Sequence, residues 1–478
     1  MKYLILILLI NLNTIVLSQN TFTYIYSTPK DEYVLDAIED EFGNFYLAGS
    51  SFNPYSDHTK GFVIKIDSYG EFVSEKVYTL PVKSYWISSI IQDSIGSFLL
   101  LGSNTDTLFQ FTNGELNLKR IDYNLVTMDS AVYSISDERS LNIIYSDVCT
   151  NTDIIVNTTA WSTINNPPAL LFSMRFSKDL DSIYATTYPY PSIGTGIKQL
   201  SDTTYWMYTG IFHKIVITDT MFNQIDQALL PETIVDPIGM KWDTDSSFYL
   251  CGQWNNQNGD KDIGIINLFN PIDTTDYVFK PWGTKDTTDY PAGRGGALDF
   301  NNKDSIFIGG TTGFTGTWGY RSYYSLIQTD SLLNVRWEKF YGGDAYYEMN
   351  DVLATNDGGC LLSGMRYDSD IGIHEHDVYI IKVDVNGLLV GLEPEQSINS
   401  FDAVVFPNPG TNEINVRVAA QYHKAEINMY EINGTKVLTK ELVGRHNLLN
   451  TESLKSGTYI YSINNKNGLN ESGIWIKK

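Results

Sequence analysis

Two short stretches decide the fold: Gly359-Cys-Leu-Leu-Ser-Gly364 and, after a polar loop, Asp377-Val-Tyr-Ile-Ile-Lys-Val-Asp384-Val-Asn-Gly387. The first is an apolar run of strand length that follows a turn and ends in a small residue. The second is a similar run that closes on Asn-Gly, a dipeptide that supplies the positive φ of a tight hairpin turn. Together they predict two short, neighbouring β-strands.

Both stretches recur along the chain. About seven copies of the first unit occur at a mean spacing of roughly 53 residues, close to the blade length of propeller repeats. The first unit occurs at Asn44–Gly49, Ser97–Gly102, Asp153–Thr158 (a weaker copy), Thr204–Gly210, Ser247–Gly252, Ser305–Gly310 and Gly359–Gly364. The second unit occurs at Gly61–Gly70, Leu108–Gly114, Leu170–Phe176, Lys214–Thr218, Asp262–Asn267, Tyr324–Gln328 and Asp377–Gly387. A further strand, as in Glu71–Glu75 and Asn334–Phe340, leads into the next repeat.

Each repeat therefore predicts three or four short strands joined by turns. Helical periodicity is almost absent, and short strands at regular spacing indicate a sandwich, a barrel or a propeller. A period of about fifty residues favours the propeller, whose radial blades leave only short edges exposed. We expect an all-β fold with a repeat-built β-propeller over residues 19–395. Seven blades are preferred, and six or eight remain open.

A different pattern follows a short polar linker at residues 396–403. Alternating apolar and polar residues, with Asn433-Gly434 as a turn, predict a small β-sandwich, for which we expect an immunoglobulin-like form. The pair Lys477-Lys478 is expected to keep the end of the last strand solvated. Four motifs occur in order: Phe406-Pro-Asn-Pro409, Met429–Val437, Leu454–Tyr461 and Gly473–Lys478.

These motifs resemble the C-terminal sorting domain of the type IX secretion system of Bacteroidota, over residues 404–478. The resemblance implies handling by the type IX machinery and passage through the periplasm and across the outer membrane. Removal of the domain, with attachment to the cell surface or release, is implied to follow. No activity is implied, because enzymes and adhesins carry the same tag. The residues that match the sorting signal are Phe406, Pro407, Asn408, Pro409, Gly434, Gly457, Tyr459, Lys477 and Lys478.

The N-terminal segment has the pattern of a signal peptide. Lys2 precedes an apolar run from Tyr3 to Ile10, and Ser18 offers a small residue for cleavage before Gln19. Residues 1–18 are assigned to this signal. Because a membrane span needs about 20 apolar residues, we expect no transmembrane segment in the mature chain.

Composition limits the partners. The formal net charge is −23, and no cluster of lysine and arginine opposes it. Nucleic acid and anionic lipid surfaces would therefore be repelled. The three cysteines, Cys149, Cys251 and Cys360, are roughly a hundred residues apart, which fits neither a zinc site nor a disulfide-dense scaffold. They are interpreted as small core residues.

Few side chains suggest chemistry. His374 and His376 are two positions apart, so on a strand both would point to one face, where a divalent metal could bind. A solvated loop is the alternative, and no other cofactor is predicted. The sequence contains neither a Gly-x-Ser-x-Gly motif nor a suggestive cysteine–histidine pair. Carboxylates are too abundant for the sequence to single out a glycosidase pair.

Three functions remain in view for the exported propeller. The preferred one is a binding or adhesion module for an extracellular glycan or surface protein. Its candidate contacts are Trp254 in one polar loop and Trp318, Tyr320 and Arg321 in another, because such side chains stack on and hydrogen-bond to polar ligands. One alternative is a polysaccharide-degrading hydrolase with carboxylates near the central channel. The other is a structural surface or gliding component.

Overall fold

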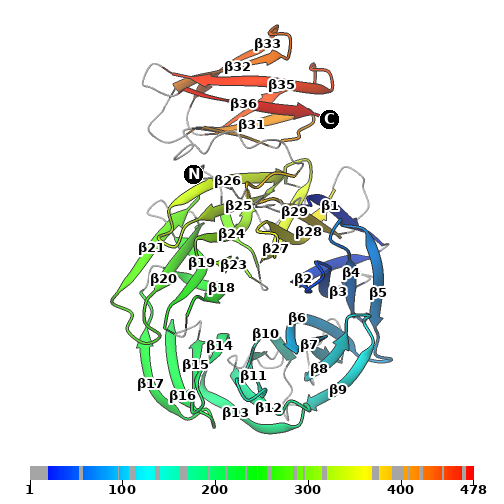
Figure 1. The fold of residues 1–478 in the computed structure, drawn as a ribbon, viewed down its shortest axis with the longest axis vertical. Coiled ribbons are helices and arrows are strands. Elements are labelled where there is room, and N and C mark those ends of the chain that lie inside the picture. Colours follow the sequence, from blue (N-terminus) through cyan, green and yellow to red (C-terminus); the bar gives the residue numbers. More distant parts are fainter. Residues whose placement is uncertain are drawn as a thin grey trace, which may run out of the picture.

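The computed structural model shows a ring of β-sheets with a separate domain beyond its rim (Figure 1). It describes residues 20–28, 30–52, 58–94, 96–106, 114–134, 140–161, 170–191, 194–209, 213–231, 234–244, 246–255, 261–283, 288–293, 296–314, 320–368, 376–389, 403–406, 408–418, 424–443, 446–465 and 470–478. The strands up to β29 form seven antiparallel sheets around a central axis. We call these sheets blades 1 to 7. All described elements are strands, which confirms the all-β propeller fold.

In each blade the first strand lies nearest the axis and the last lies at the rim (Figure 1). Blade 1 contains β2 (Asp31–Glu39), β3 (Phe45–Phe52), β4 (Lys60–Ile66) and β5 (Phe72–Tyr78). Blade 2 contains β6 (Ser84–Ser94), β7 (Ser97–Thr105), β8 (Glu115–Asp122) and β9 (Thr127–Ser134). Blade 3 contains β10 (Ser140–Val148), β11 (Ile154–Trp161), β12 (Leu170–Phe176) and β13 (Ser182–Pro191). Blade 4 contains β14 (Gly194–Ser201), β15 (Thr204–Thr209), β16 (Lys214–Asp219) and β17 (Gln224–Leu229).

The remaining three blades include two departures from this plan. Blade 5 contains β18 (Val235–Trp242), β19 (Phe248–Asn255), β20 (Lys261–Leu268) and β21 (Tyr277–Trp282). In blade 6, β22 (Asp289–Pro291) and β23 (Leu298–Asn302) both pair with β24 (Ser305–Thr312), and β25 (Tyr323–Thr329) and β26 (Val335–Gly342) follow. Blade 7 contains β27 (Tyr346–Ala354), β28 (Cys360–Tyr367) and β29 (His376–Val383), and its last strand is the N-terminal β1 (Phe22–Tyr26).

The repeated apolar unit forms the second strand of each blade: β3, β7, β11, β15, β19, β24 and β28. These strands are covered by a strand on each side and by a neighbouring blade on each face. A close backbone approach explains the small residue at the end of the unit. A Cβ added to Gly49 would lie 2.0 Å from the carbonyl oxygen of Tyr33, and one added to Gly364 would lie 2.1 Å from that of Glu348. A side chain at these positions would push the first strand away.

The predicted Asp-x-x-Gly hairpin turns are confirmed. Asp67 Oδ1 accepts hydrogen bonds of 2.9 Å from the backbone N–H groups of Tyr69 and Glu71, and Gly70 has a φ of 84°. The same turn occurs without glycine, because Leu333 has a φ of 61° and its side chain is 1% exposed. At such positions the burial of an apolar side chain offsets the strain of the left-handed backbone.

One predicted strand was misplaced. The copy assigned to Leu108–Gly114 falls largely outside the described residues, and the third strand of blade 2 is β8, at Glu115–Asp122. This segment alternates apolar and polar residues and ends in Asp122, which opens the turn to β9.

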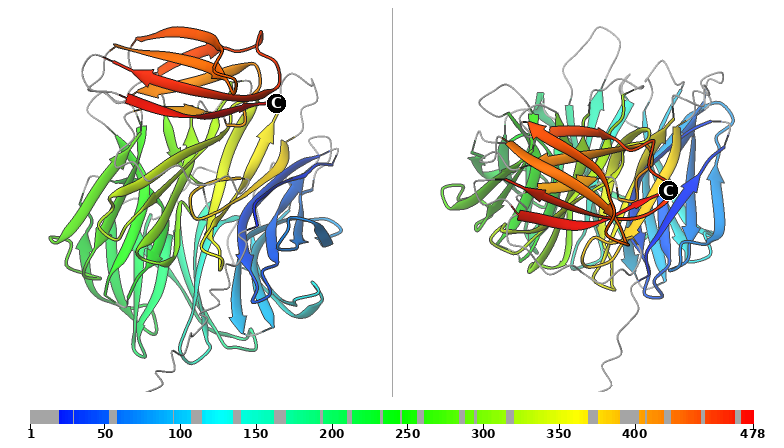
Figure 2. Two further views of the ribbon diagram at one scale, coloured as in Figure 1. Left: turned by 45° about the horizontal axis from the view of Figure 1, so that its top comes forward. Right: turned by 90° about the horizontal axis from the view of Figure 1, so that it is seen from above.

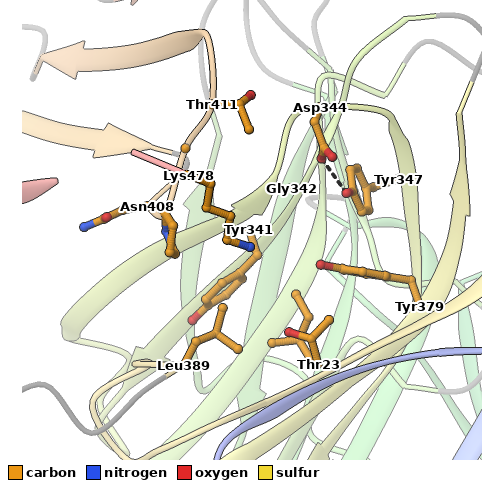
Figure 3. Close-up of a pocket in the computed structure, with 13 residues that line it drawn as sticks. Thr23, Tyr341, Gly342, Asp344, Tyr347, Tyr379, Leu389, Asn408, Thr411 and Lys478 are labelled. Atoms are coloured by element: carbon orange, nitrogen blue, oxygen red, sulfur yellow. Dashed lines mark hydrogen bonds between the residues drawn. The ribbon is translucent and has the colours of Figure 1, made fainter. Parts of the chain in front are cut away.

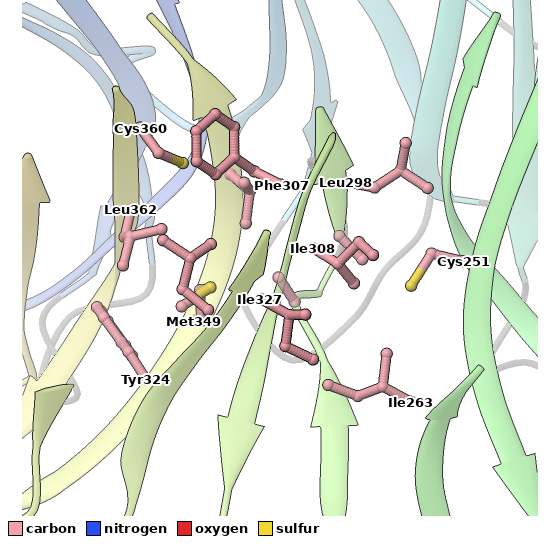
Figure 4. Close-up of a cluster of buried hydrophobic side chains, with 14 of the residues drawn as sticks. Cys251, Ile263, Leu298, Phe307, Ile308, Tyr324, Ile327, Met349, Cys360 and Leu362 are labelled. Carbon is pink, nitrogen blue, oxygen red and sulfur yellow. The ribbon is translucent and has the colours of Figure 1, made fainter. Parts of the chain in front are cut away.

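The hydrophobic core is divided into clusters that lie between neighbouring blades. The largest joins blades 5, 6 and 7 (Figure 4) and includes Cys251, Phe307, Ile327, Met349 and Cys360. All three cysteines are free and buried, as expected. Burial raises the pKa of the Cys149 thiol to about 12, and the thiols therefore behave as core groups.

The C-terminal domain consists of two sheets that enclose a core of their own. One sheet contains β30 (Ala403–Phe406), β31 (Glu413–Val418) and β34 (His446–Asn450). The other contains β32 (Lys424–Glu431), β33 (Lys436–Val443), β35 (Gly457–Asn464) and β36 (Asn470–Lys477). Ile414 and Val416 of the first sheet share a core with Ile427 and Trp475 of the second. The arrangement is a sandwich, while its immunoglobulin-like form and the domain limits at 395 and 404 stay predictions.

The expectation of a solvated lysine pair at the chain end is wrong for Lys477. Its side chain is 7% exposed, and its Nζ donates to the Thr451 carbonyl oxygen at 2.8 Å and to Asn412 Oδ1 at 3.2 Å. A buried ammonium needs such acceptors. Lys478, one position further, is exposed.

Candidate functional site

A pocket of about 120 Å³ lies where the C-terminal domain meets blades 6 and 7 (Figure 3). Figure 2 shows that domain beside the rim of the ring rather than over its axis. The propeller contributes Thr23, Tyr341, Gly342, Asp344, Tyr347, Tyr379, Ile381 and Leu389 to the lining. The C-terminal domain contributes Asn408, Pro409, Gly410, Thr411 and Lys478. Three tyrosines, one aspartate and one lysine are thus among the residues that line this small space.

The propeller side of the pocket is fixed by an aromatic and ionic network. The Tyr347 hydroxyl donates to Asp344 Oδ1 at 2.6 Å, and its ring lies 5.1 Å from the ring of Tyr379. Arg366 lies behind this pair, with Nε 3.1 Å from the Tyr347 oxygen and Nη2 2.8 Å from Asp368. Burial opposes ionisation of Asp344, but the hydrogen bond from Tyr347 and the charge of Arg366 hold its pKa below the ordinary value. The carboxylate is therefore charged at neutral pH.

Two glycines bring the backbone close to these rings. Gly342 and Gly343 have φ values of 97° and 87°. A Cβ on Gly342 would lie 2.7 Å from the Tyr347 ring, and one on Gly343 would lie 1.9 Å from the ring of Tyr323. The turn between β26 and β27 can thus present Asp344 at the pocket only with glycine at both positions.

The C-terminal side of the pocket is held by the last strand. Asn408 Nδ2 donates to the Ile474 carbonyl oxygen at 2.7 Å, and Asn408 Oδ1 accepts from the Ile476 N–H at 2.9 Å. Gly410 N donates to the Ile476 oxygen at 2.8 Å and the Lys478 N–H donates to the Gly410 oxygen at 2.9 Å. The Asn-Pro-Gly turn and the chain end therefore form one rigid edge that faces the propeller.

A second contact joins the two domains beside the pocket. Arg321 Nη1 lies 2.6 Å from Glu413 Oε2, and Asn415 donates a hydrogen bond to the Tyr323 hydroxyl. Burial raises the pKa of this tyrosine. Arg321 was predicted from the sequence as a ligand contact, and the structure places it against the C-terminal domain.

Removing the Arg321–Glu413 ion pair should change stability very little. The side chains are 51% and 38% exposed, and exposed pairs contribute about 0–1 kcal/mol. We expect a coupling free energy below ~1 kcal/mol in a double-mutant cycle of Arg321→Ala and Glu413→Ala, measured by urea unfolding of the C-terminal domain. A coupling of several kcal/mol would show that the pair is desolvated and holds the domains together.

A cluster of three aspartates lies on the innermost strands of blades 6, 7 and 1. Asp299 lies on β23, Asp351 on β27 and Asp36 on β2. Burial is the main cause that raises the pKa of Asp36 to about 6, and the negative charge of Asp299 acts in the same direction. Burial and the charges of Asp36 and Asp299 also raise the pKa of Asp351. A shared pKa perturbation of this kind marks a candidate acid–base site.

The same aspartates have a structural role, because side chains on innermost strands accept hydrogen bonds from the next blade. The pairs are Asp36 Oδ2 with Ser89 Oγ (2.7 Å) and Ile90 N (2.8 Å), Asp147 Oδ2 with Gln199 N (2.8 Å), and Asp299 Oδ2 with Ala354 N (2.8 Å). Asp299 Oδ1 also lies 2.7 Å from Lys241 Nζ of blade 5. These bonds satisfy backbone donors on β6, β14 and β27 and join the blades concerned.

The remaining predicted site residues lie apart. Trp254 is the last residue but one of β19 and packs on Phe279 in its own blade, with 6.0 Å between ring centroids. Tyr320 is 63% exposed near Arg321 in blade 6. Trp318 and His374 lie outside the described residues.

His376 belongs to the contact between blades 7 and 1. It is 2% exposed, its Nδ1 lies 2.7 Å from Asp31 Oδ1, and its backbone N–H donates to the same oxygen at 2.9 Å. Within the described part of the chain, no group of three or more His, Cys, Asp or Glu side chains is arranged to hold a metal. In the same part, no helix has the length and apolarity of a membrane span.

Sequence reasoning missed the tyrosine pocket. The segment Tyr341-Gly-Gly-Asp344-Ala-Tyr-Tyr347 interrupts strand alternation with two glycines and three tyrosines, which was an available signal. The sequence indicated only that Tyr379 lies on a strand. The pairing of β27, β28 and β29 brings Tyr379 close to Tyr347.

Comparisons with known proteins identify the C-terminal domain. Residues 404–477 match the family of secretion system C-terminal sorting domains. The chain is therefore exported by the type IX system to the cell surface or the extracellular space. No curated protein sequence gives a significant match.

Several solved structures are similar to this chain at low sequence identity. Virginiamycin B lyase from Staphylococcus aureus, solved with quinupristin, is 12% identical, with 76% of this chain and 100% of that chain covered and a TM-score of 0.47. A streptogramin B lyase is 13% identical, with 76% and 97% covered and a TM-score of 0.47. An α-L-arabinofuranosidase from Fusarium graminearum is 11% identical, with 77% and 98% covered and a TM-score of 0.39.

Proposed function

We propose that this chain is an exported binding module whose propeller, residues 19–395, recognises an extracellular glycan or surface protein. The observation that carries the proposal is the cluster of Tyr341, Asp344, Tyr347 and Tyr379 on blades 6 and 7, which forms the propeller side of the pocket. Aromatic faces beside one fixed carboxylate are typical of sites that hold polar ligands by stacking and hydrogen bonds. Tyr320 and Arg321, expected contacts from the sequence, lie next to Tyr323 on the same rim and extend this surface.

The proposal is tested on a propeller freed from its sorting domain after folding. A protease site placed between residues 390 and 402 allows the full chain to fold before it is cut. The cut protein is applied to immobilised polysaccharides and to surface-protein fractions, and retained protein and released sugar are measured together. We expect the cut protein to be retained without releasing sugar. Asp344→Ala should reduce retention about tenfold or more. The matched Tyr69→Ala, at an exposed tyrosine on blade 1, should leave retention unchanged.

A second candidate function is a polysaccharide hydrolase, favoured by the mutually interacting carboxylates of Asp36, Asp299 and Asp351. A neutral acid beside an ionised one is the pattern of glycoside hydrolysis. If the protein releases sugar and Asp351→Asn abolishes that release, the hydrolase proposal replaces the binding proposal. Neither retention nor product on any probe would favour a structural role at the surface.

A further inference from the structure

We infer that the export signal of this chain is the folded C-terminal sandwich, and that Lys477 and Asn408 of its sorting motifs are positioning residues rather than contacts for the secretion machinery. Both residues are bonded within the domain, where they hold the last strand, β36. The machinery then recognises the surface of the assembled domain. This inference concerns export and does not depend on the proposed binding function.

Lys477 joins the two sheets of the sandwich from inside. Its side chain is 7% exposed, and its Nζ donates to the Thr451 carbonyl oxygen at 2.8 Å and to Asn412 Oδ1 at 3.2 Å. Asn412 precedes β31 and Thr451 follows β34, and the Thr451 N–H donates to the Asn412 carbonyl oxygen at 2.7 Å. The ammonium therefore ties the end of β36, in the second sheet, to the paired strands of the first. An ammonium enclosed in this way is already bonded and is not presented to a receptor outside the domain.

Asn408 holds the same strand from its open side. β36 is the last strand of its sheet, so its outer backbone groups have no neighbouring strand there. The Asn408 side chain takes that place, because its Nδ2 donates to the Ile474 oxygen at 2.7 Å and its Oδ1 accepts from the Ile476 N–H at 2.9 Å. The first and the last motif, 66 residues apart, thus form one structural unit. Asn408 also lines the pocket on the side that meets blades 6 and 7.

The motif residues between these two ends pack β35 on β36. Tyr459 is 4% exposed, its hydroxyl donates to the Lys455 oxygen at 2.7 Å, and it is the register partner of the fully buried Trp475. A Cβ on Gly473 would lie 2.4 Å from the hydroxyl oxygen of Tyr461. The motifs therefore specify how the sandwich assembles, and an unfolded chain with the same motifs lacks the surface that the sandwich presents.

The test measures export and stability of full-chain variants in a Bacteroidota host with an active type IX system. Lys477→Ala should lower the folded-to-unfolded ratio of the C-terminal domain about tenfold or more, because Thr451 and Asn412 lose a charged donor. The exported fraction should fall with it. Ile414→Ala, at a fully buried core residue outside the four motifs, is the matched variant. The exposed Lys478→Ala, inside the last motif, is the control and should change neither quantity.

Export measured at several growth temperatures gives each variant a range of folded fractions, and urea unfolding of the C-terminal domain supplies those fractions. We expect wild type, Lys477→Ala, Ile414→Ala and Lys478→Ala to follow one curve of exported against folded fraction. Any of three results would overturn the inference. Lys477→Ala could be exported less than Ile414→Ala at equal folded fraction, which would mean that the machinery contacts the ammonium. Lys478→Ala could lose export with unchanged stability, or Ile414→Ala could be exported normally while its domain is unfolded, and the signal would then be the motif itself.

Discussion

A chain that lacks residues 20–26 should lose about 5 kcal/mol of propeller stability, because β1 closes the ring. β1 pairs with β29 from Phe22 through Tyr26 and supplies the fourth strand of a blade whose other strands come from the far end of the propeller. Phe22, Tyr24 and Tyr26 pack against the core shared by blades 1 and 7. Truncating one well-buried aromatic costs about 3–5 kcal/mol, and these three are half-buried. The melting temperature should therefore fall by roughly 10 °C.

Calorimetry of the truncated chain checks this prediction, and two single variants calibrate it. Ile25 is 51% exposed, so Ile25→Ala should change the melting temperature by only about 1 °C. Tyr24→Ala, on the opposite face of the same strand, should give an intermediate decrease. An unchanged melting temperature in the truncated chain would mean that blade 7 is complete with three strands and that β1 only decorates it.

The repeating part of the fold could be predicted because each blade carries its own local signals. The apolar run ending in Gly49 or Gly364 reports a close approach between the first and second strands, and Asp67-x-x-Gly70 reports a turn. The closure by β1 could not be predicted in the same way. Phe22-Thr-Tyr-Ile-Tyr26 alternates like any strand, and its partner, Lys382 to Val378, lies over 350 residues away. Nothing within such a segment identifies so distant a neighbour.

The candidate site, like the fold, could be predicted from the sequence only in part. Arg321 and Tyr320 were expected contacts because a loop rich in aromatic and polar residues is visible in the sequence, and their role in binding stays a prediction. The pocket itself was not, since Tyr347 and Tyr379 lie on strands separated by β28, and Lys478 comes from another domain. The metal pair of His374 and His376 stays a prediction, because His374 lies outside the described residues. The contact of His376 with Asp31 across two blades is a relation that only the closed ring creates.

The contact between blades 7 and 1 should also make the propeller more stable as the pH falls from 8 to 5. Burial raises the pKa of Glu32 to about 8, of Glu39 to about 7 and of Asp36 to about 6, all on β2. The charged neighbours of Glu32 are Asp377 and Lys30. Those of Glu39 are Asp357 and Lys382. Those of Asp36 are Asp299 and Asp351. A carboxyl whose pKa is raised on folding holds its proton more tightly in the folded state. Its stabilising effect is full below the unfolded pKa and is lost as the pH rises through the folded pKa.

Asp36→Asn isolates one part of this effect. The shift of the Asp36 pKa from 3.8 to about 6 corresponds to roughly 3 kcal/mol of stability in acid, of which about half should be lost between about pH 5 and about pH 7.5. The amide is neutral at every pH and its oxygen can still accept from Ile90 N, so the variant should keep the contact with blade 2 without its pH dependence. Melting temperatures measured at pH 5, 6, 7 and 8 should rise toward acid in the wild type, with a slope that is clearly smaller in Asp36→Asn. Asp179→Asn, at a side chain that is 68% exposed, is the control and should follow the wild type.

The direction of this pH effect separates two interpretations of the aspartate cluster. Carboxylates that stay ionised in their hydrogen bonds, as Asp344 does, stabilise a protein at neutral pH and lose that effect in acid. A melting temperature that falls steadily from pH 8 to pH 5 would place Asp36 in that class, and the blades would then be joined by charged acceptors. A rise toward acid would show that the ring closes best with protons on its inner carboxyls. Export into surroundings of lower pH would then tighten the scaffold that presents the pocket on blades 6 and 7.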